Sequence, residues 1–177
     1  SIAEKAEVSV SNIYNYFTGK DDLFTTTLQP LLTQIQQGKK FLYNIEFDLS
    51  SEVEQNLAEH QDMISAISTF IDEYRELLKV LVFKSYGSSL QNYEEQIIEW
   101  YTEIWSNYVV EHNKEVKINR FIIRNIVGIW YNLLREVLKQ EITGEELTNS
   151  ARDMVSLMFG GWQSVLAEKS KKGEKLM

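Results

Sequence analysis

The chain has 177 residues, of which 44% are hydrophobic and 25% are charged, and its formal net charge is −8. These values are ordinary for a globular protein with one sizeable core, and they argue against a strongly basic nucleic-acid-binding surface over the whole chain. The chain has no cysteine, which excludes disulfides and thiolate metal sites and fits a cytoplasmic location. A single proline and the helical spacing of the apolar residues predict an all-α protein, and no apolar run is long enough to predict a membrane span.

Two short helices joined by a tight turn are predicted for residues 1–17. Ser9 is a good N-cap for the second helix. We expect the apolar residues of this helix to face inward: Val10, Ile13 and Phe17. Polar and aromatic side chains crowd its other face: Ser11, Asn12, Tyr14, Asn15 and Tyr16. Such a surface suits a polar partner, because several hydrogen-bonding groups stand together there without charges.

At these residues the chain resembles the TetR/AcrR family of bacterial transcriptional regulators. The residues that match the family pattern at fixed spacing are Ile2, Ala3, Ala6, Val8, Ser9, Ile13, Tyr14, Tyr16, Phe17, Lys20 and Leu23. Glu7 stands where the family usually has glycine, so this residue must adopt a turn conformation that glycine adopts more cheaply. The family has one more helix before this motif, and we expect that helix to be missing from a chain that starts at Ser1.

The resemblance implies a helix-turn-helix head with its connecting helix over residues 1–45, and a body for effector binding and dimerisation over residues 46–177. It implies that the second helix enters the major groove of a double-stranded DNA operator. The residues expected to contact DNA are Ser9, Val10, Ser11, Asn12, Tyr14, Asn15, Tyr16 and Lys20. Acidic and basic side chains balance over residues 1–45, so we expect an upstream segment to supply the cations that DNA binding needs.

The connecting helix begins at Lys20, with Asp21 and Asp22 in its first turn, where carboxylates interact favourably with the helix dipole. Pro30 lies inside this helix and should bend it. In the family that the chain resembles, this helix links the head to the body and tilts when ligand binds. Residues 46–59 follow as a loop and a short polar helix, with a capping box of Ser51 and Glu54.

Helical periodicity predicts further helices over residues 62–74, 77–83, 93–109, 118–138 and 147–166. The segment 77–83 is apolar nearly all round, so we expect a short helix that is buried on most sides. A capping box of Thr143 and Glu146 marks the start of the last helix.

Amphipathic aromatic side chains come from several helices of the predicted body. Such side chains line apolar cavities and also offer hydrogen-bonding groups, although for any one of them alone an ordinary core position is favoured. Because the resemblance implies an effector pocket among the middle helices, we expect an unknown small-molecule effector to contact Phe70, Tyr74, Phe83, Tyr86, Tyr101, Trp105 and Trp130. Lys84, Arg124 and Arg135 interrupt apolar runs, and they either bind an anionic effector or extend to the surface.

The last two helices are apolar on two sides, so each needs a second partner, and another copy of the chain is the most economical one. Gly160 and Gly161 each cost roughly 1 kcal/mol relative to alanine within a helix. Close approach of two helices would explain them, and a kink or an early helix end is the alternative. The expected dimer interface comprises Ile126, Trp130, Leu134, Met154, Met158, Gly161, Trp162 and Val165.

The sequence offers little for catalysis. His60 and His112 are far apart and have no metal-ligand spacing, and there is neither a Gly-rich phosphate loop nor a nucleophile elbow. We therefore predict no enzyme activity, no cofactor and no metal site. The expected function is a ligand-responsive transcriptional regulator, a repressor, that binds a palindromic operator as a homodimer. The alternative is a helical effector-binding or protein-docking module that no longer binds DNA, which the uncharged head and Glu7 favour.

Overall fold

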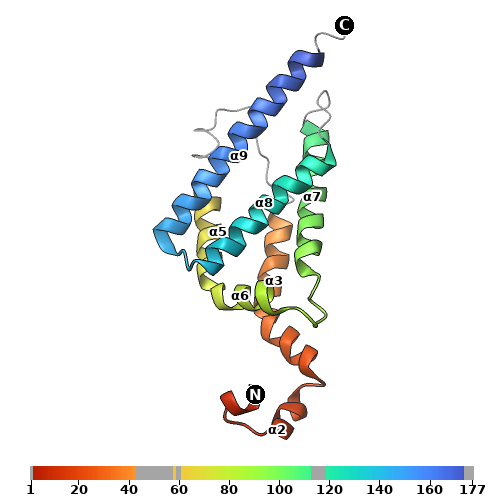
Figure 1. Ribbon diagram of the computed structural model, residues 1–177, viewed down its shortest axis with the longest axis vertical. Coiled ribbons are helices and arrows are strands. Elements are labelled where there is room, and N and C mark those ends of the chain that lie inside the picture. Colours follow the sequence, from red (N-terminus) through yellow and green to blue (C-terminus); the bar gives the residue numbers. More distant parts are fainter. Residues whose placement is uncertain (1, 43–57, 59–60, 113–118, 174–177) are drawn as a thin grey trace.

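The computed structural model describes residues 2–42, 58, 61–112 and 119–173, and every regular element in these ranges is an α-helix (Figure 1). In chain order the helices are α1 (Ile2–Lys5), α2 (Val10–Tyr16), α3 (Lys20–Leu42), α5 (Gln61–Glu73), α6 (Arg75–Lys84), α7 (Tyr93–His112), α8 (Arg120–Lys139) and α9 (Gly144–Gly173). The all-α prediction is confirmed. The predicted capping box of Ser51 and Glu54, with its short polar helix, and His60 lie outside the described residues.

The body is built from helix pairs. α7 packs along α8 and α5 packs along α9, while the short α6 lies across one end of the body and contacts α3, α5 and α8 (Figure 1). One core cluster joins α3, α6, α7 and α8 through Leu28, Leu31, Leu78, Leu81, Tyr93 and Leu138. A second cluster joins α5, α7 and α9 through Ile64, Val109, Val155 and Phe159.

The helix α3 connects this body to the two short N-terminal helices, which lie at its far end (Figure 1). It continues as one helix through the exposed Pro30. Proline lacks an N–H and leaves the carbonyl of Thr26 without its intrahelical donor. Leu28 and Leu31, on either side of the proline, are fully buried, so packing against the body compensates for the lost backbone bond.

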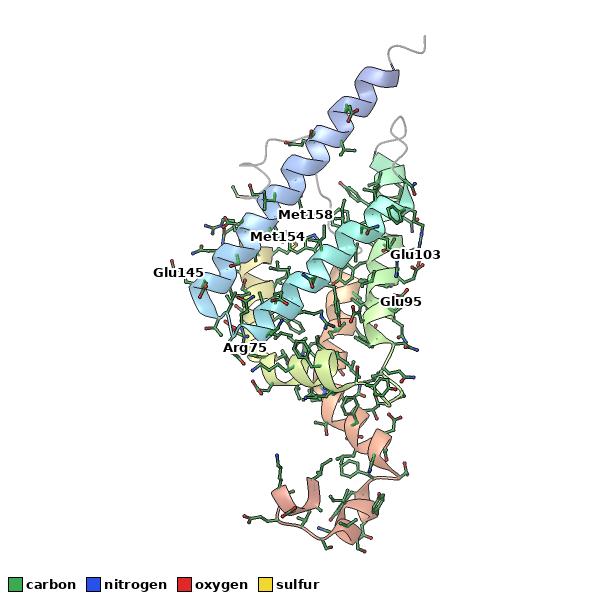
Figure 2. All side chains as sticks on the ribbon, viewed as in Figure 1. Arg75, Glu95, Glu103, Glu145, Met154 and Met158 are labelled. Atoms are coloured by element: carbon green, nitrogen blue, oxygen red, sulfur yellow. The ribbon has the colours of Figure 1, made fainter. Side chains whose placement is uncertain are left out.

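Arg75 lies at the start of α6 (Figure 2) and forms hydrogen bonds with residues at or near the ends of other helices. Its side chain is only 11% exposed, and its guanidinium donates to Asp72 of α5 at 2.7 Å and to the carbonyl oxygens of Val137 and Ile142. The other carboxylate oxygen of Asp72 accepts from the N–H of Gly144, at the start of α9, at 2.8 Å. The bond from Arg75 and, secondarily, the bond from Gly144 hold the pKa of Asp72 below its ordinary value. The start of α9 is therefore capped from α5, a contact that the local capping-box pattern did not predict.

Candidate functional site

The turn between α1 and α2 has the conformation that the sequence predicted for Glu7. This residue has a φ of 54°, in the left-handed region. Its N–H donates to the carbonyl of Glu4 at 3.2 Å, and the N–H of Val8 donates to the carbonyl of Ala3 at 3.0 Å. This pair of bonds is the Schellman motif, whose left-handed position glycine usually occupies. The turn is thus closed by regular bonds and carries a local backbone cost.

We expect replacing Glu7 with glycine to stabilise this turn by about 0.5–1 kcal/mol, because glycine adopts a positive φ without the clash of a Cβ. The measurement is amide hydrogen exchange of residues 2–17, which should slow in the Glu7→Gly variant. Glu4→Gly, a matched change inside α1, should speed exchange instead, since glycine weakens a helix interior. Faster exchange in Glu7→Gly would contradict the assignment of strain to this position.

Ser9 starts the second helix as an N-cap. It has extended backbone angles, and its hydroxyl oxygen accepts from the N–H of Asn12 at 3.0 Å. The predicted cap is confirmed. Because its hydroxyl oxygen accepts this bond, Ser9 stabilises the first turn of α2. The side chains that follow Ser9 in α2 are the ones that can contact a partner.

The helix α2 has no buried residue. Tyr16 is 77% exposed, Val10 57% and Tyr14 55%, and the remaining predicted DNA contacts are also exposed: Ser11, Asn12, Asn15 and Lys20. Ile13 and Phe17 are half-buried. The prediction that Val10 faces inward is wrong, because no described helix covers that side of α2. All predicted contact residues of this helix are accessible together.

The acidic residues that follow α2 are engaged in hydrogen bonds. The carboxylate of Asp22 accepts from the N–H and the hydroxyl of Thr18 at 2.7 and 3.0 Å, and these bonds lower its pKa. The carboxylate of Asp21 accepts from the N–H and the hydroxyl of Ser89, in the loop between α6 and α7, at 2.8 and 3.1 Å. The first turn of α3 is thereby joined to the body.

The aromatic residues predicted to bind an effector do not form one group. Phe70 and Tyr74, whose rings are 5.2 Å apart, pack against the first core cluster. Trp105 and Trp130 pack against the second cluster. Tyr86 is 96% exposed, so it lies outside both clusters and its predicted place in a pocket is wrong.

A buried phenol that the sequence did not single out lies within the first core cluster. Among the described residues, the hydroxyl of Tyr93 is buried without a hydrogen-bond partner, and such a group typically costs about 1–3 kcal/mol. Burial raises the pKa of Tyr101 and of Tyr131 to about 12, and each lies close enough to sense Tyr93 electrostatically. The phenols of Tyr101 and Tyr131 therefore stay protonated at neutral pH. The available signal was the spacing of Tyr93 and Tyr101, which places them two turns apart on one stripe of α7.

Two of the three cations considered for an anionic effector, Arg124 and Arg135, form ion pairs with glutamates of α7. Arg124 donates to both carboxylate oxygens of Glu95 at 2.7 and 2.8 Å and to Glu99 at 3.1 Å. Arg135 donates to Glu94 at 3.1 Å. Arg124 therefore lies on the exposed face between α7 and α8, away from the Tyr93 hydroxyl.

A different cation approaches the aromatic residues of α7. Lys39 of α3 lies over the ring of Trp100, with its ammonium 4.7 Å from the ring centroid, and burial lowers its pKa. The rings of Trp100 and Tyr101 meet edge to face at 4.6 Å. Lys39 is thus the cation best placed to meet a ligand that enters between α3 and α7.

The predicted dimer residues divide between the interior and the surface. Trp130 and Leu134 are partly buried and pack against the core clusters of their own chain, and their place in a dimer interface stays a prediction. Ile126, Met154 and Met158 are half-buried; Figure 2 shows the two methionines on α9. Gly161 is exposed and Val165 is 36% exposed, while the side chain of Trp162 lies outside the described part of the structure. The exposed apolar residues that the sequence did not select are Phe121, Ile122 and Ile129 on α8 and Leu157 on α9.

The helix α9 runs through Gly160 and Gly161 without ending. A Cβ atom built at either glycine meets nothing within 4 Å. Packing among the residues that the structure describes therefore gives no reason for two glycines in this helix. Together with Leu157 and Val165, Gly161 lies on a stripe of α9 spaced by four residues, which we call the α9 face.

Comparison of the chain with family models, with curated proteins and with solved structures finds no match. Within the described ranges, no group of His, Asp and Glu side chains could hold a metal ion. No described helix combines the length and the apolar character needed to cross a membrane. The features that point to a function are α2, the buried phenols of Tyr93, Tyr101 and Tyr131 (the Tyr93 cluster), and the exposed faces of α8 and α9.

Proposed function

We propose that this chain is a ligand-responsive DNA-binding transcriptional regulator of the kind that its TetR/AcrR resemblance implies. It acts as a cytoplasmic repressor that binds a palindromic double-stranded operator as a homodimer. The observation that carries the proposal is the capped helix α2, whose predicted contact residues are all exposed and which lies at the end of α3 away from the rest of the body (Figure 1). A helix that is capped at its start by Ser9 and has no buried residue presents its side chains to an external partner.

In this proposal the N-terminal residues of α2 read the bases. Asn12 has a side-chain amide that pairs with adenine, and Val10 offers an apolar contact to a thymine methyl group. Tyr14, Tyr16 and Lys20 contact phosphates and fix the register of the helix. The two heads of a dimer then bind half-sites that are related by two-fold symmetry.

The effector, in this proposal, enters the body between α3 and α7. The unpaired hydroxyl of Tyr93 donates to an acceptor on the ligand, and Lys39 with Trp100 lies at the other end of the same helix pair. Ligand binding then favours one position of α3 over another and changes the separation of the heads. This is a shift of population between two arrangements and needs no contact between ligand and DNA.

Two substitutions test how α2 reads DNA. Tyr16→Ala should weaken binding to all sequences by a similar factor, because a phosphate contact carries no sequence information. Asn12→Ala should cost about 1–3 kcal/mol at one base position and relax preference there. The measurement is selection of bound sequences from a random DNA library, followed by mobility shifts on the selected sequences. Asn107→Ala, at an exposed position of α7, is the matched control and should change neither property.

The second candidate function is a helical effector-binding or protein-docking module without DNA binding. The balance of charges around α2 favours it, since Lys5 and Lys20 are offset there by Glu4 and Glu7, whereas phosphate contacts need excess cations. If the chain is dimeric and selects no DNA even at low salt, this second function stands and the repressor proposal fails.

A further inference from the structure

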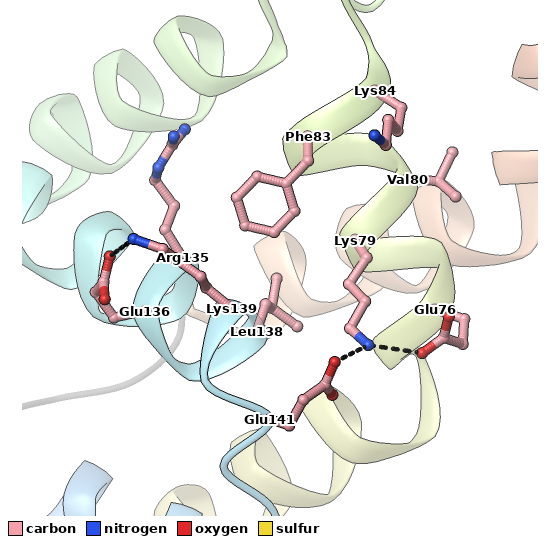
Figure 3. Close-up of a pocket in the computed structure, with 10 residues that line it drawn as sticks. All are labelled: Glu76, Lys79, Val80, Phe83, Lys84, Arg135, Glu136, Leu138, Lys139 and Glu141. Carbon is pink, nitrogen blue, oxygen red and sulfur yellow. Dashed lines mark hydrogen bonds and ion pairs between the residues drawn. The ribbon is translucent and has the colours of Figure 1, made fainter.

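A surface groove lies between α6 and α8, and its lining includes the predicted effector contact Phe83 together with Lys84 and Arg135, the cations considered for an anionic effector. Its volume is about 690 Å³, within the range of small-molecule sites. Val80, Phe83 and Leu138 give it an apolar lining (Figure 3). Phe83 is 38% exposed, so one aromatic ring is presented to solvent inside a concave surface.

The charged groups at the two ends of this groove differ in the ion pairs that they form. At one end the ammonium of Lys79 bridges Glu76 at 3.0 Å and Glu141 at 2.5 Å (Figure 3). Both carboxylates raise the pKa of Lys79. This end is therefore closed by its own ion pairs and offers no unpaired cation to a ligand.

The other end carries two cations on the sides of Phe83. The guanidinium carbon of Arg135 lies 5.5 Å from the centroid of the Phe83 ring, and one guanidinium nitrogen donates a hydrogen bond to Glu94. The ammonium of Lys84 lies on the α6 side of the ring, and Figure 3 draws no hydrogen bond or ion pair from it to any residue of the groove. An aromatic ring between two cations, one of them without a carboxylate in the groove, complements an anion with a flat apolar body.

We propose that this groove binds a small aromatic anion. The aromatic body of the ligand lies against Phe83 and Val80, and its carboxylate or sulfonate lies between Lys84 and Arg135. The site is distinct from the Tyr93 cluster, since Tyr93 does not line the groove.

The test is a fluorescence titration of the full chain with anilinonaphthalene sulfonate and with its uncharged counterpart, phenylnaphthylamine. Lys84→Gln should weaken the sulfonate about five- to tenfold, the range of one charge-assisted contact at a partly exposed site, and should leave the uncharged probe unchanged. Phe83→Ala should weaken both probes about tenfold, because both use the ring. Helical circular dichroism and thermal melts establish that each variant is folded.

Two further variants control for charge. Lys84→Arg keeps the cation and should retain sulfonate binding, and Lys139→Gln, which removes a rim cation paired with Glu136, should change it less than twofold. Equal binding of the sulfonate by wild type, Phe83→Ala and Lys84→Gln would overturn the proposal. So would equal losses in Lys84→Gln and Lys139→Gln, because general electrostatics would then explain the effect. Failure of the wild type to bind the sulfonate would overturn it as well.

Discussion

Replacing Arg75 with alanine is expected to lower the free energy of unfolding by about 3 kcal/mol, the scale seen when one partner of a buried ion pair is removed. The guanidinium is nearly buried and donates hydrogen bonds to the carboxylate of Asp72 and to the carbonyl oxygens of Val137 and Ile142. Alanine leaves these acceptors without their donor, and water reaches them poorly. The loss is measured by urea denaturation followed by helical circular dichroism.

Arg120→Ala is the matched control for this prediction. Arg120 pairs with Glu99, and both side chains are 51% exposed, so its loss should cost less than about 1 kcal/mol. Arg75→Lys should recover only part of the stability, because a lysine ammonium cannot reproduce the planar fork of the guanidinium. Equal destabilisation by Arg75→Ala and Arg120→Ala would show that the helix ends are not held together by Arg75.

The second large effect concerns the α9 face. Leu157→Glu should convert the proposed homodimer into a monomer, raising the dimer dissociation constant at least about a hundredfold, because each interface would bury an unpaired carboxylate. Leu157 is 73% exposed in the single chain, so the substitution leaves the fold of each protomer intact. Analytical ultracentrifugation over a range of concentrations measures the change.

Ile67→Glu provides the comparison for the dimer prediction. Ile67 is 45% exposed on α5, a different helix from the one that carries the α9 face, and its substitution should leave the oligomeric state unchanged. A wild-type chain that sediments as a monomer at micromolar concentration would contradict the dimer. A dimer that tolerates Leu157→Glu would place the interface elsewhere.

Features determined by neighbours in sequence could be predicted from the sequence. The left-handed Glu7 follows from the position of the turn, and the Ser9 cap follows from a hydroxyl residue just before a helical run. The helices of the body follow from apolar periodicity, which only requires that one stripe be buried.

Features determined by residues far apart in sequence could not be predicted. The cap of α9 comes from Asp72, which is 72 positions before Gly144, and no local pattern encodes that pairing. A helix that is apolar on two sides does not reveal which side faces its own chain, so the sequence does not show that Leu157 is exposed while Trp130 packs against the second core cluster. The direction of Tyr86 is set by the loop that carries it, and residue type alone does not specify it.

Because α3 is long, a small rotation at one of its ends produces a large displacement at the other. At about 1.5 Å per residue, its 23 residues span roughly 34 Å. A rotation of about 5° at the body end of a rod of that length displaces the other end by roughly 3 Å, close to the rise of one DNA base pair along a strand. The bonds between Asp21 and Ser89 join the start of this rod to the α6–α7 loop. In the proposed repressor, a displacement of this size at the start of α3, where Asp21 is bonded to Ser89 and must move with the α6–α7 loop, would change the register of α2 at the operator.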